Sequence, residues 1–324
     1  MKRLLGMGNA LVDALLRLEN DDLLARLGLA KGAMQLIDTA RFHEIRSRLE
    51  GLHMARATGG SAANTVQALA RLGARPGLVG MTGRDDDGRF FARQCRRLGI
   101  APYLLESDLP TGVASTFISP DGQRTFATYL GAAAQLRAED VRPDWFRDFD
   151  YFYVEGYLVQ NHQLIDRAID TARQAGCCVC LDLSSYNVVA ADRDFFASLL
   201  PRTDIVFANE DEAYAFTGKT AGRALDALAR ICPTVVVKTG PGGAMARCGS
   251  EMAESPAPDV ERVVDTTGAG DFFAAGFLYM HALGADLVEC IDAGNLLGSH
   301  VIQTVGASLT DEAWASIRET LPRP

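Results

Sequence analysis

The most informative stretch of the sequence is Asp265-Thr266-Thr267-Gly268-Ala269-Gly270-Asp271, which leads directly into an apolar helical segment at 272–280. Two glycines around an alanine let successive backbone N–H groups point at one centre, and the helix that begins there adds the positive end of its dipole. Such a loop suits a developing phosphoryl charge, and Asp271 could accept a proton from an attacking hydroxyl. The stretch therefore predicts phosphoryl transfer to an alcohol. The alternative is that the aspartates only cap a helix and the glycines only form a turn.

A second motif lies far upstream, at Gly59-Gly60-Ser61-Ala62-Ala63-Asn64. With both motifs in this order, the chain resembles the PfkB, or ribokinase-like, family of carbohydrate and nucleoside kinases. In that family the upstream element binds the sugar and the downstream element carries catalysis. The resemblance implies that Asp271 is the catalytic base, and that an anion hole is formed by the backbone amides of Gly268, Ala269 and Gly270.

The composition is that of an ordinary globular protein. The chain has 324 residues, 48% of them hydrophobic, and a formal net charge of −9. Because it has no basic stripe, we expect no nucleic-acid partner. Asn9 and Asp13 interrupt the apolar stretch after Lys2 and Arg3 before a signal-peptide core is complete, and no apolar run approaches the length of a membrane span. We therefore expect a cytoplasmic protein that binds no membrane.

The cysteines and histidines do not predict a metal site or a disulfide framework. The seven cysteines are an odd number, and they are scattered through a chain that otherwise looks intracellular. The only cluster, Cys177, Cys178 and Cys180, has the character of a buried strand of small apolar residues. The five histidines make no pair with metal-ligand spacing.

Short apolar runs alternate with helical patterns along the chain. Strands are predicted at 77–81, 151–154, 179–183, 204–207 and 234–237, and helices at 62–72, 88–98, 161–174 and 211–217. This alternation predicts an α/β fold, in which a central, mostly parallel sheet is covered by helices on both faces and ligands bind at the carboxyl ends of the strands. The family resemblance implies the ribokinase-like version of that fold.

Two regions, 9–37 and 103–129, break the alternation and become strand-like and rich in turns. We interpret them as parts of a small β lid, and the resemblance implies a lid that closes over the sugar site. A lid would exclude water, which could otherwise hydrolyse ATP. The chain 1–324 is thus predicted to be one kinase domain with this lid inserted in its α/β body.

Within the family, the chain resembles the adenosine kinases from Gly6 through Gly306. The resemblance implies substrate-binding roles for two sets of residues: ribose contacts at Asp13, Gly60 and Asn64, and nucleoside contacts at Gln35, Phe126 and Tyr157. A carboxylate suits the vicinal hydroxyls of a ribose, and aromatic side chains suit a purine. The alternative for each aromatic is an ordinary core position. Ala114 and Thr128 depart from the adenosine kinase pattern, so the base pocket is expected to differ in shape.

On the nucleotide side, Asn209 and Glu212 resemble the family's NxxE element, which would face phosphate and metal-bound water; the same spacing is also that of a capping box. The resemblance further implies that the loop beside the nucleotide contains Lys238, Thr239, Gly240 and Gly243, and that Asn295 lies near the adenine of ATP. Arg124 on the lid could swing in toward the phosphates.

The resemblance also implies a possible monovalent cation site, in which the side chains of Asp265 and Thr267 and the backbone carbonyls of 302–306 hold K⁺. The predicted reaction is ATP- and Mg²⁺-dependent transfer of the γ-phosphoryl group to the 5′-hydroxyl of a ribonucleoside, with adenosine the preferred acceptor. One alternative is a sugar kinase of the same family that acts on ribose, fructose or a keto-sugar acid. Another is a non-catalytic protein that binds a nucleoside or sugar. The sequence leaves open whether the protein is a monomer or a homodimer.

Overall fold

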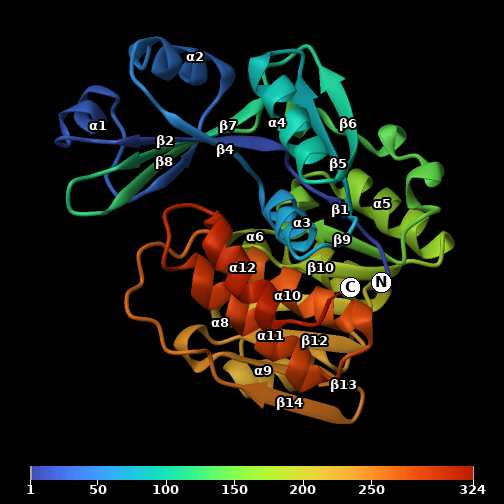
Figure 1. Ribbon diagram of the computed structural model, residues 1–324. Coiled ribbons are helices and arrows are strands. Elements are labelled where there is room, and N and C mark those ends of the chain that lie inside the picture. Colours follow the sequence, from blue (N-terminus) through green and yellow to red (C-terminus); the bar gives the residue numbers. More distant parts are fainter. Residues whose placement is uncertain (1, 324) are drawn as a thin grey trace.

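The computed structural model describes residues 2–323, which form two β-sheets and the helices around them (Figure 1). Within this range the larger sheet has nine strands in the order β14-β13-β12-β11-β10-β9-β1-β5-β6. The smaller sheet has five strands in the order β3-β8-β7-β2-β4. Figure 1 shows the smaller sheet to one side of the larger one.

The larger sheet is parallel except at one edge, where β13 and β14 each run antiparallel to the preceding strand. Its strands are β1 (Leu4–Met7), β5 (Gly77–Gly83), β6 (Ala101–Ser107), β9 (Tyr151–Glu155), β10 (Cys178–Asp182), β11 (Ile205–Asn209), β12 (Thr234–Lys238), β13 (Ala244–Cys248) and β14 (Glu251–Ser255). The predicted α/β fold with a mostly parallel central sheet is confirmed. The cysteine cluster is part of β10 and the residue before it.

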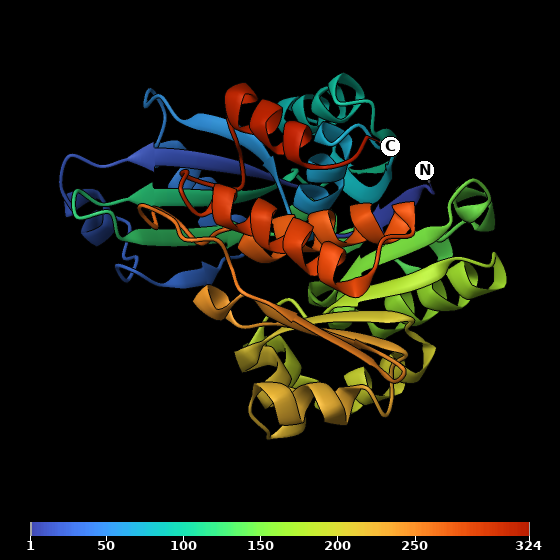
Figure 2. The same cartoon turned by 60° about the horizontal axis from the view of Figure 1, so that its bottom comes forward.

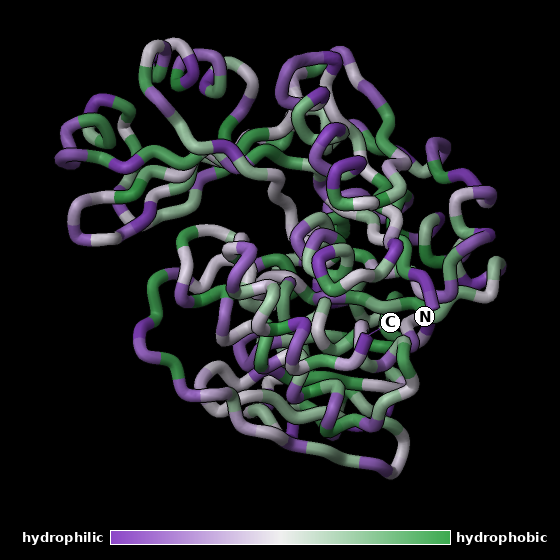
Figure 3. The backbone as a smooth tube through the Cα atoms, in the orientation of Figure 1, coloured by the Kyte–Doolittle hydropathy of each residue, from purple (hydrophilic) through white to green (hydrophobic). Residues whose placement is uncertain are grey.

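Helices cover both faces of this sheet because side chains of its strands alternate between two cores. Tyr153 packs on the side of α3, α4 and α10 to α12, whereas Phe152 and Val154 pack on the side of α5 and α7 to α9. Figure 2 shows α10 and α11 across the front of the sheet, and Figure 3 shows hydrophobic residues concentrated along the strands. The bounds are α3 (Ser61–Arg71), α4 (Asp86–Arg97), α5 (His162–Gln174), α6 (Tyr186–Ala191), α7 (Arg193–Leu199), α8 (Glu210–Thr217), α9 (Ala221–Leu228), α10 (Ala269–Leu283), α11 (Leu287–Val301) and α12 (Asp311–Thr320).

The predicted helices lie close to those observed in α3, α4, α5 and α8, with ends displaced by at most two residues. Short 3-10 helices occur at Gly131–Gln135, Ala138–Asp140, Pro143–Phe146, Gly156–Gln160, Leu200–Arg202 and Gly240–Gly242. In the range 2–323, none of the helices combines the length and the apolar character needed to cross a membrane.

The smaller sheet is the lid, and its outer face is covered by two short helices. Its strands are β2 (Leu11–Arg17), β3 (Met34–Leu36), β4 (Ala55–Gly59), β7 (Gly112–Ile118) and β8 (Arg124–Tyr129), and the helices are α1 (Asp22–Arg26) and α2 (Thr39–Arg48). Leu16, Phe117 and Ala127 point outward and pack with apolar residues of α1 and α2. The opposite face of the lid is left open toward the body.

The lid differs at its edges from the two predicted segments. It also contains β4, which lies beyond residue 37, and residues 103–107 belong to β6, which pairs with β5 in the larger sheet. The sequence of β4, Ala55-Arg56-Ala57-Thr58-Gly59, carries no large apolar residue and therefore has no strand pattern of its own. Pairing with β2 makes it a strand, so tertiary context sets these boundaries.

Candidate active site

Four polar residues end four neighbouring parallel strands of the larger sheet. They are Glu155 on β9, Asp182 on β10, Asn209 on β11 and Lys238 on β12. The carboxyl ends of parallel strands meet at one edge of a sheet, which is where α/β proteins bind ligands. A cavity of about 1610 Å³ lies there and is lined by all four residues, by the start of α10 and by the inner face of the lid.

Asp271 lies in the first turn of α10 and lines this cavity. The helix is preceded by Gly268, whose φ of 80° is in the left-handed region that favours glycine. The Asp271 carboxylate accepts hydrogen bonds from Ser61 Oγ at 2.6 Å and from Asn64 Nδ2 at 2.8 Å. Burial raises the pKa of Asp271 to about 6, although these two hydrogen bonds act in the opposite direction. A carboxylate with this pKa is suited to general-base work near neutral pH.

The upstream glycine motif forms the start of α3, directly opposite Asp271. Gly60 has a φ of 100°, and a Cβ there would lie 1.9 Å from the carbonyl oxygen of Asn9, so only glycine fits. Asn64 is buried, and its Oδ1 has no hydrogen-bond partner among residues 2–323. The structure therefore brings the predicted Gly60 and Asn64 together with Asp271. The structure also adds Ser61 to the site. Its position between Gly60 and Asn64 in the motif was the signal by which the sequence could have indicated it.

Glu155 was not predicted as a site residue, yet it positions this motif. Its side chain is 1% exposed and accepts hydrogen bonds from the Asn9 backbone N–H at 2.8 Å, from Asn9 Nδ2 at 2.6 Å and from the Ala62 backbone N–H at 2.8 Å. Burial raises the pKa of Glu155 to about 7. The carboxylate thereby fixes the N-terminus of α3 against β9.

Asp13 faces the cavity from the lid, on β2. A Cβ on Gly59 would lie 2.3 Å from Asp13 Oδ1, so the glycine leaves room for the carboxylate. Burial raises the pKa of Asp13 to about 7, and the nearby charges of Asp271 and Asp265 raise it as well. Asp13 and Asp271 thus line the same cavity, Asp13 from β2 of the lid and Asp271 from the first turn of α10.

The rest of the lid's inner face is mostly apolar. Met34 and Leu36 on β3 are 59% and 57% exposed and line the cavity. The other lid residues that line it, besides Asp13 and Arg124, are Leu11, Leu15, Ala57, Ala114, Thr116, Phe126 and Thr128. Ala114 and Thr128, which depart from the adenosine kinase pattern, are thus part of the cavity wall.

Of the three predicted nucleoside contacts, two line the cavity and one does not. Phe126 pairs in register with Met34 and faces inward, and Tyr157 donates a hydrogen bond from its hydroxyl to the carbonyl oxygen of Ser184 at 3.1 Å. Gln35 is absent from the cavity wall, because it alternates with Met34 and Leu36 along β3. The structure therefore does not bring Gln35 together with the other two on the cavity wall.

Asn209 and Glu212 form a complete capping box at the start of α8. Glu212 accepts from the Asn209 backbone N–H and from Asn209 Nδ2, and its own backbone N–H donates to Asn209 Oδ1, each at 2.8 Å. Burial raises the pKa of Glu212 to about 7, opposed by the charge of Lys238. The capping alternative is realised, and both residues also line the cavity.

The predicted nucleotide loop follows β12. Lys238, Gly240 and Gly243 line the cavity, whereas Thr239 does not and instead donates its backbone N–H to the Gly243 carbonyl at 2.8 Å. Asn295 on α11 also lines the cavity, and its Nδ2 donates to the backbone carbonyls of Ser255 at 3.0 Å and Pro256 at 3.2 Å. Asn295 thus holds the segment after β14 beside the loop.

Asp265, the first residue of the downstream motif, already has protein partners on both carboxylate oxygens. Oδ1 accepts from Thr267 N at 3.0 Å and Thr267 Oγ1 at 2.8 Å, and Oδ2 accepts from Gly306 N at 2.6 Å. Arg124 of the lid forms an ion pair with Asp265 and donates to Thr267 Oγ1 at 3.3 Å. The lid arginine therefore contacts the loop that leads into α10.

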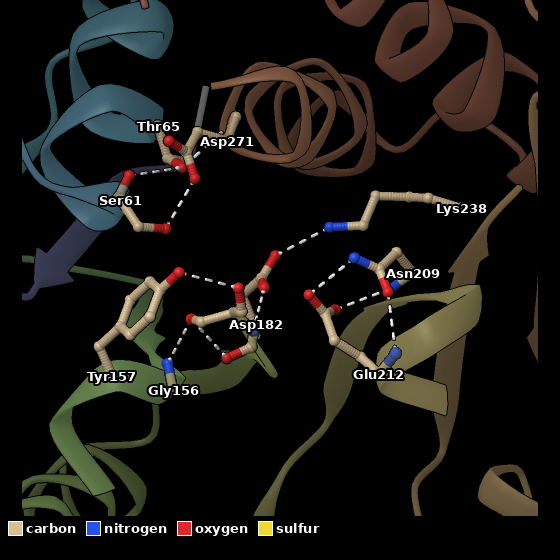
Figure 4. A network of polar contacts seen from close by, with 10 residues as sticks. Ser61, Thr65, Gly156, Tyr157, Asp182, Asn209, Glu212, Lys238 and Asp271 are labelled. Carbon is tan, nitrogen blue, oxygen red and sulfur yellow. Dashed lines mark hydrogen bonds and ion pairs between the residues drawn. The ribbon is translucent and has the colours of Figure 1, made fainter. Parts of the chain in front are cut away.

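Asp182 and Lys238 form an ion pair, with 3.2 Å between Oδ2 and Nζ (Figure 4). Asp182, like Glu155 and Ser61, was not predicted as a site residue. In the described part of the chain, no group of three or more His, Cys, Asp or Glu side chains could hold a metal ion.

The loop, the paired glycine motif and the carboxylate in the first turn of α10 match a known family model. The model of the pfkB family carbohydrate kinases matches residues 23–314. The chain belongs to this family. It is therefore a phosphotransferase with an alcohol group as acceptor, and PfkB-family kinases use ATP, typically with Mg²⁺.

Relatives of this PfkB kinase differ in the acceptors that their names give. The adenosine kinase from Sinorhizobium meliloti has a structure similar to it, with a TM-score of 0.87, 35% identity and 99% of each chain covered. A probable sugar kinase from Rhizobium etli has a TM-score of 0.87 at 33% identity, with 98% of each chain covered. The aminoimidazole riboside kinase of Salmonella typhimurium is 30% identical over 77% of this chain and 83% of its own.

Proposed function

We propose that this PfkB kinase transfers the γ-phosphoryl group of ATP to the 5′-hydroxyl of a ribonucleoside, with adenosine as the preferred acceptor. The observation that carries the proposal is the pairing of Asp271 with Asp13 across one cavity whose lid face is apolar. A carboxylate on each wall suits a ribose that must be held at one end and deprotonated at the other. An apolar wall suits a purine.

In this mechanism Asp271 is the general base and Asp13, Gly60 and Asn64 orient the ribose. Asn64 Oδ1 is a buried acceptor without a protein partner, which supports a role toward a substrate hydroxyl. Asn64 Nδ2 and Ser61 Oγ hold the Asp271 carboxylate in place. The backbone amides of Gly268, Ala269 and Gly270 would stabilise the charge on the transferred group.

The residues around the nucleotide loop fit ATP, because Lys238, Gly240, Gly243 and Asn295 line the same cavity as Asp271. We propose that they bind the nucleotide, with Thr239 supporting the loop. Bound Mg²⁺ would neutralise phosphate charge, and it prefers phosphate oxygens and water to a cage of protein side chains. Asn209 and Glu212 fit direct metal coordination poorly because the capping box uses their polar atoms, so we propose contact through water.

A monovalent cation at Asp265 and Thr267 is a further part of the proposal. Arg124 lies against both residues when the lid is in the position described. K⁺ would therefore need Arg124 to move, for example toward the phosphates. Activity that is unchanged when K⁺ is replaced by a series of bulky organic cations would contradict a K⁺ site.

A sugar kinase is the second candidate function. It is favoured by the similarity to the probable sugar kinase from Rhizobium etli. Against it, Met34, Leu36 and Phe126 give the lid an apolar face that a free sugar has little reason to contact. The names of two other similar proteins give ribosides, adenosine and aminoimidazole riboside, as acceptors.

The deciding experiment measures ADP release with Mg-ATP and a panel of adenosine, inosine, guanosine, cytidine, ribose and fructose. We expect the highest kcat/KM with adenosine. Turnover with ribose or fructose but none of the nucleosides would reject the nucleoside assignment and keep the catalytic one. We propose that the active species is one kinase domain with its lid, as a monomer or a homodimer. The same assay on gel-filtration fractions would show which of the two is active.

A further inference from the structure

Lys238 is the last residue of β12, and its ammonium group lies beside the anion hole. A Cβ built on Gly270 would lie 3.0 Å from Lys238 Nζ. Gly270 is one of the three residues whose amides would hold the transferred phosphoryl group. The positive charge is therefore placed next to the point where negative charge develops during phosphoryl transfer, whichever alcohol is the acceptor.

The ammonium group is held in this place by Asp182, at the end of the neighbouring strand β10. The Nζ to Oδ2 distance is 3.2 Å, and the two side chains are 13% and 5% exposed. Asp182 is itself oriented, because its Oδ1 accepts the Ser184 backbone N–H at 2.7 Å. In Figure 4 the Lys238 side chain points from its strand toward Asp182, and Asp271 lies on the other side of the open space.

Ser184 has a φ of 66°, and it is the one non-glycine residue with positive φ in the range 2–323. Such backbone conformations cost free energy and tend to persist at functional sites, where the surroundings enforce them. Ser184 Oγ accepts the backbone N–H of Gly156 at 2.8 Å, which ties the turn to the end of β9. The turn therefore presents the carboxylate of Asp182 to Lys238.

Lys238 remains charged in this environment. Burial alone would lower its pKa, but the negative charges of Asp182 and Glu212 outweigh burial and raise the pKa of Lys238 above its usual value. A buried ion pair is weak evidence for stability, because desolvation offsets much of the attraction. A catalytic role accounts for a charged lysine at the end of an otherwise apolar strand.

We propose that Lys238 is a catalytic residue that contacts the transferred γ-phosphoryl group, and that Asp182 is its positioning residue. In the transfer step the acceptor oxygen forms a bond to the γ-phosphorus, and the bond from that phosphorus to the β–γ bridging oxygen breaks. Asp271 takes the proton of the acceptor hydroxyl and ADP leaves with the bond electrons. Lys238 stays protonated throughout and donates a hydrogen bond to a non-bridging oxygen. This goes beyond binding the nucleotide, because the contact strengthens as the bond to ADP breaks.

The proposal rests on the kinase reaction but not on the identity of the acceptor. The test compares Lys238→Ala, Lys238→Arg and the exposed control Lys219→Ala, using the best acceptor from the panel above. We expect Lys238→Ala to lower kcat about 10²- to 10³-fold while the KM of the acceptor changes less than about threefold. Lys219→Ala should behave as the wild type. Lys238→Arg keeps a positive charge and should therefore have a kcat between those of Lys238→Ala and the wild type.

Chemical rescue separates a catalytic cation from a structural one. Ethylammonium added to Lys238→Ala should restore part of kcat, and tetramethylammonium, which donates no hydrogen bond, should not. A raised KM for ATP with unchanged kcat would overturn the proposal, because it would show uniform binding of the nucleotide. A rate loss that no amine rescues, accompanied by an equal loss of folded protein in a thermal melt, would also overturn it.

Asp182→Asn tests the positioning role. It should lower kcat about tenfold or more, with some loss of melting temperature because Lys238 loses its buried partner. In the double variant with Lys238→Ala, the rescue should depend less on which primary amine is added, because the carboxylate that positions the ammonium group is gone. A lower melting temperature with wild-type kcat would assign Asp182 to stability alone. If the panel shows that a sugar is the acceptor, the nucleoside proposal fails. The same measurements made with that sugar would still test the catalytic role of Lys238.

Discussion

The carboxyl edge of the larger sheet and the inner face of the lid line the same cavity but are built differently. At the edge, Glu155, Asp182 and Glu212 are buried, and each carboxylate has hydrogen-bond or ion-pair partners. On the lid, Met34 and Leu36 are exposed apolar side chains that line the cavity. The edge is a hydrogen-bonded row of polar side chains, whereas the lid wall is mostly apolar around Asp13 and Arg124.

We infer that this difference separates the reaction from the choice of acceptor. Phosphoryl transfer needs charges fixed in place before the reaction, which a hydrogen-bonded edge of parallel strands provides. Acceptor recognition needs a surface whose shape can change without disturbing those charges, and we propose that the lid is this surface. The similar proteins include adenosine, aminoimidazole riboside and sugar kinases, so their names give different acceptors.

The largest effect is expected from Asp271→Asn. Losing the general base should lower kcat by about two orders of magnitude or more while leaving acceptor binding nearly unchanged. The measurement is steady-state kcat together with calorimetric binding of the acceptor. Nearly normal turnover would remove Asp271 from the mechanism and place the base elsewhere.

Asp13→Asn should act on the acceptor and not on ATP. Losing hydrogen bonds to a charged group should raise the acceptor KM roughly 10- to 100-fold, with the KM of ATP unchanged. Initial rates measured while the concentrations of the acceptor and of ATP are each varied give the two KM values separately. An equal rise in the KM of the acceptor and in the KM of ATP would contradict the proposal that the lid binds the acceptor and the sheet edge binds the nucleotide.

The pH profile of kcat/KM should have an acidic limb. The pKa of Asp271 is about 6 and that of Asp13 about 7, so both lose their negative charge as pH falls from 8 to 5. Activity should fall about tenfold per pH unit below the lower pKa for each required carboxylate. Asp13→Asn should keep only the limb of Asp271, and a flat profile in the wild type would contradict a carboxylate base.

Phe126→Ala should sharpen the acceptor assignment. Losing an aromatic contact should lower kcat/KM for adenosine about five- to tenfold and leave ribose, if it is turned over at all, unaffected. Thr125→Ala, next to it on β8 but buried on the outer side, is the matched control for damage to the lid. An equal loss for every acceptor would show that Phe126 shapes the lid without contacting a base.

The smallest effect is expected from Asn209→Ala. If the capping box is its main role, the free energy of unfolding should fall by about 1 kcal/mol in urea titrations, with little change in the KM of ATP. Asp211→Ala, in the same first turn but outside the box, should have a smaller effect on stability. A raised KM for ATP at unchanged stability would instead assign Asn209 to the nucleotide.

Particular residues show how far sequence reasoning reaches here. The anion loop, its helix and Asp271 could be predicted because glycine conformation, helix start and carboxylate all lie within seven neighbouring residues. Gly60 and Asn64 were predicted only through the family resemblance of the upstream motif at 59–64. The resemblance placed Gln35 near the nucleoside, whereas the alternation of side chains along β3 leaves it off the cavity wall, and three residues are too few to show this from the sequence.

Ser61 and Asp271 are 210 residues apart in sequence and are joined by a hydrogen bond, as are Asn9 and Glu155 across 146 residues. The sequence by itself determined the α/β class, several of its strands and helices and the chemistry of the loop before α10, because these depend on local backbone preference and on alternating polarity. Only the tertiary structure decided that Ser61, Glu155 and Asp182 belong to this site. Strand order, register and burial set which distant side chains meet, and no local pattern encodes them.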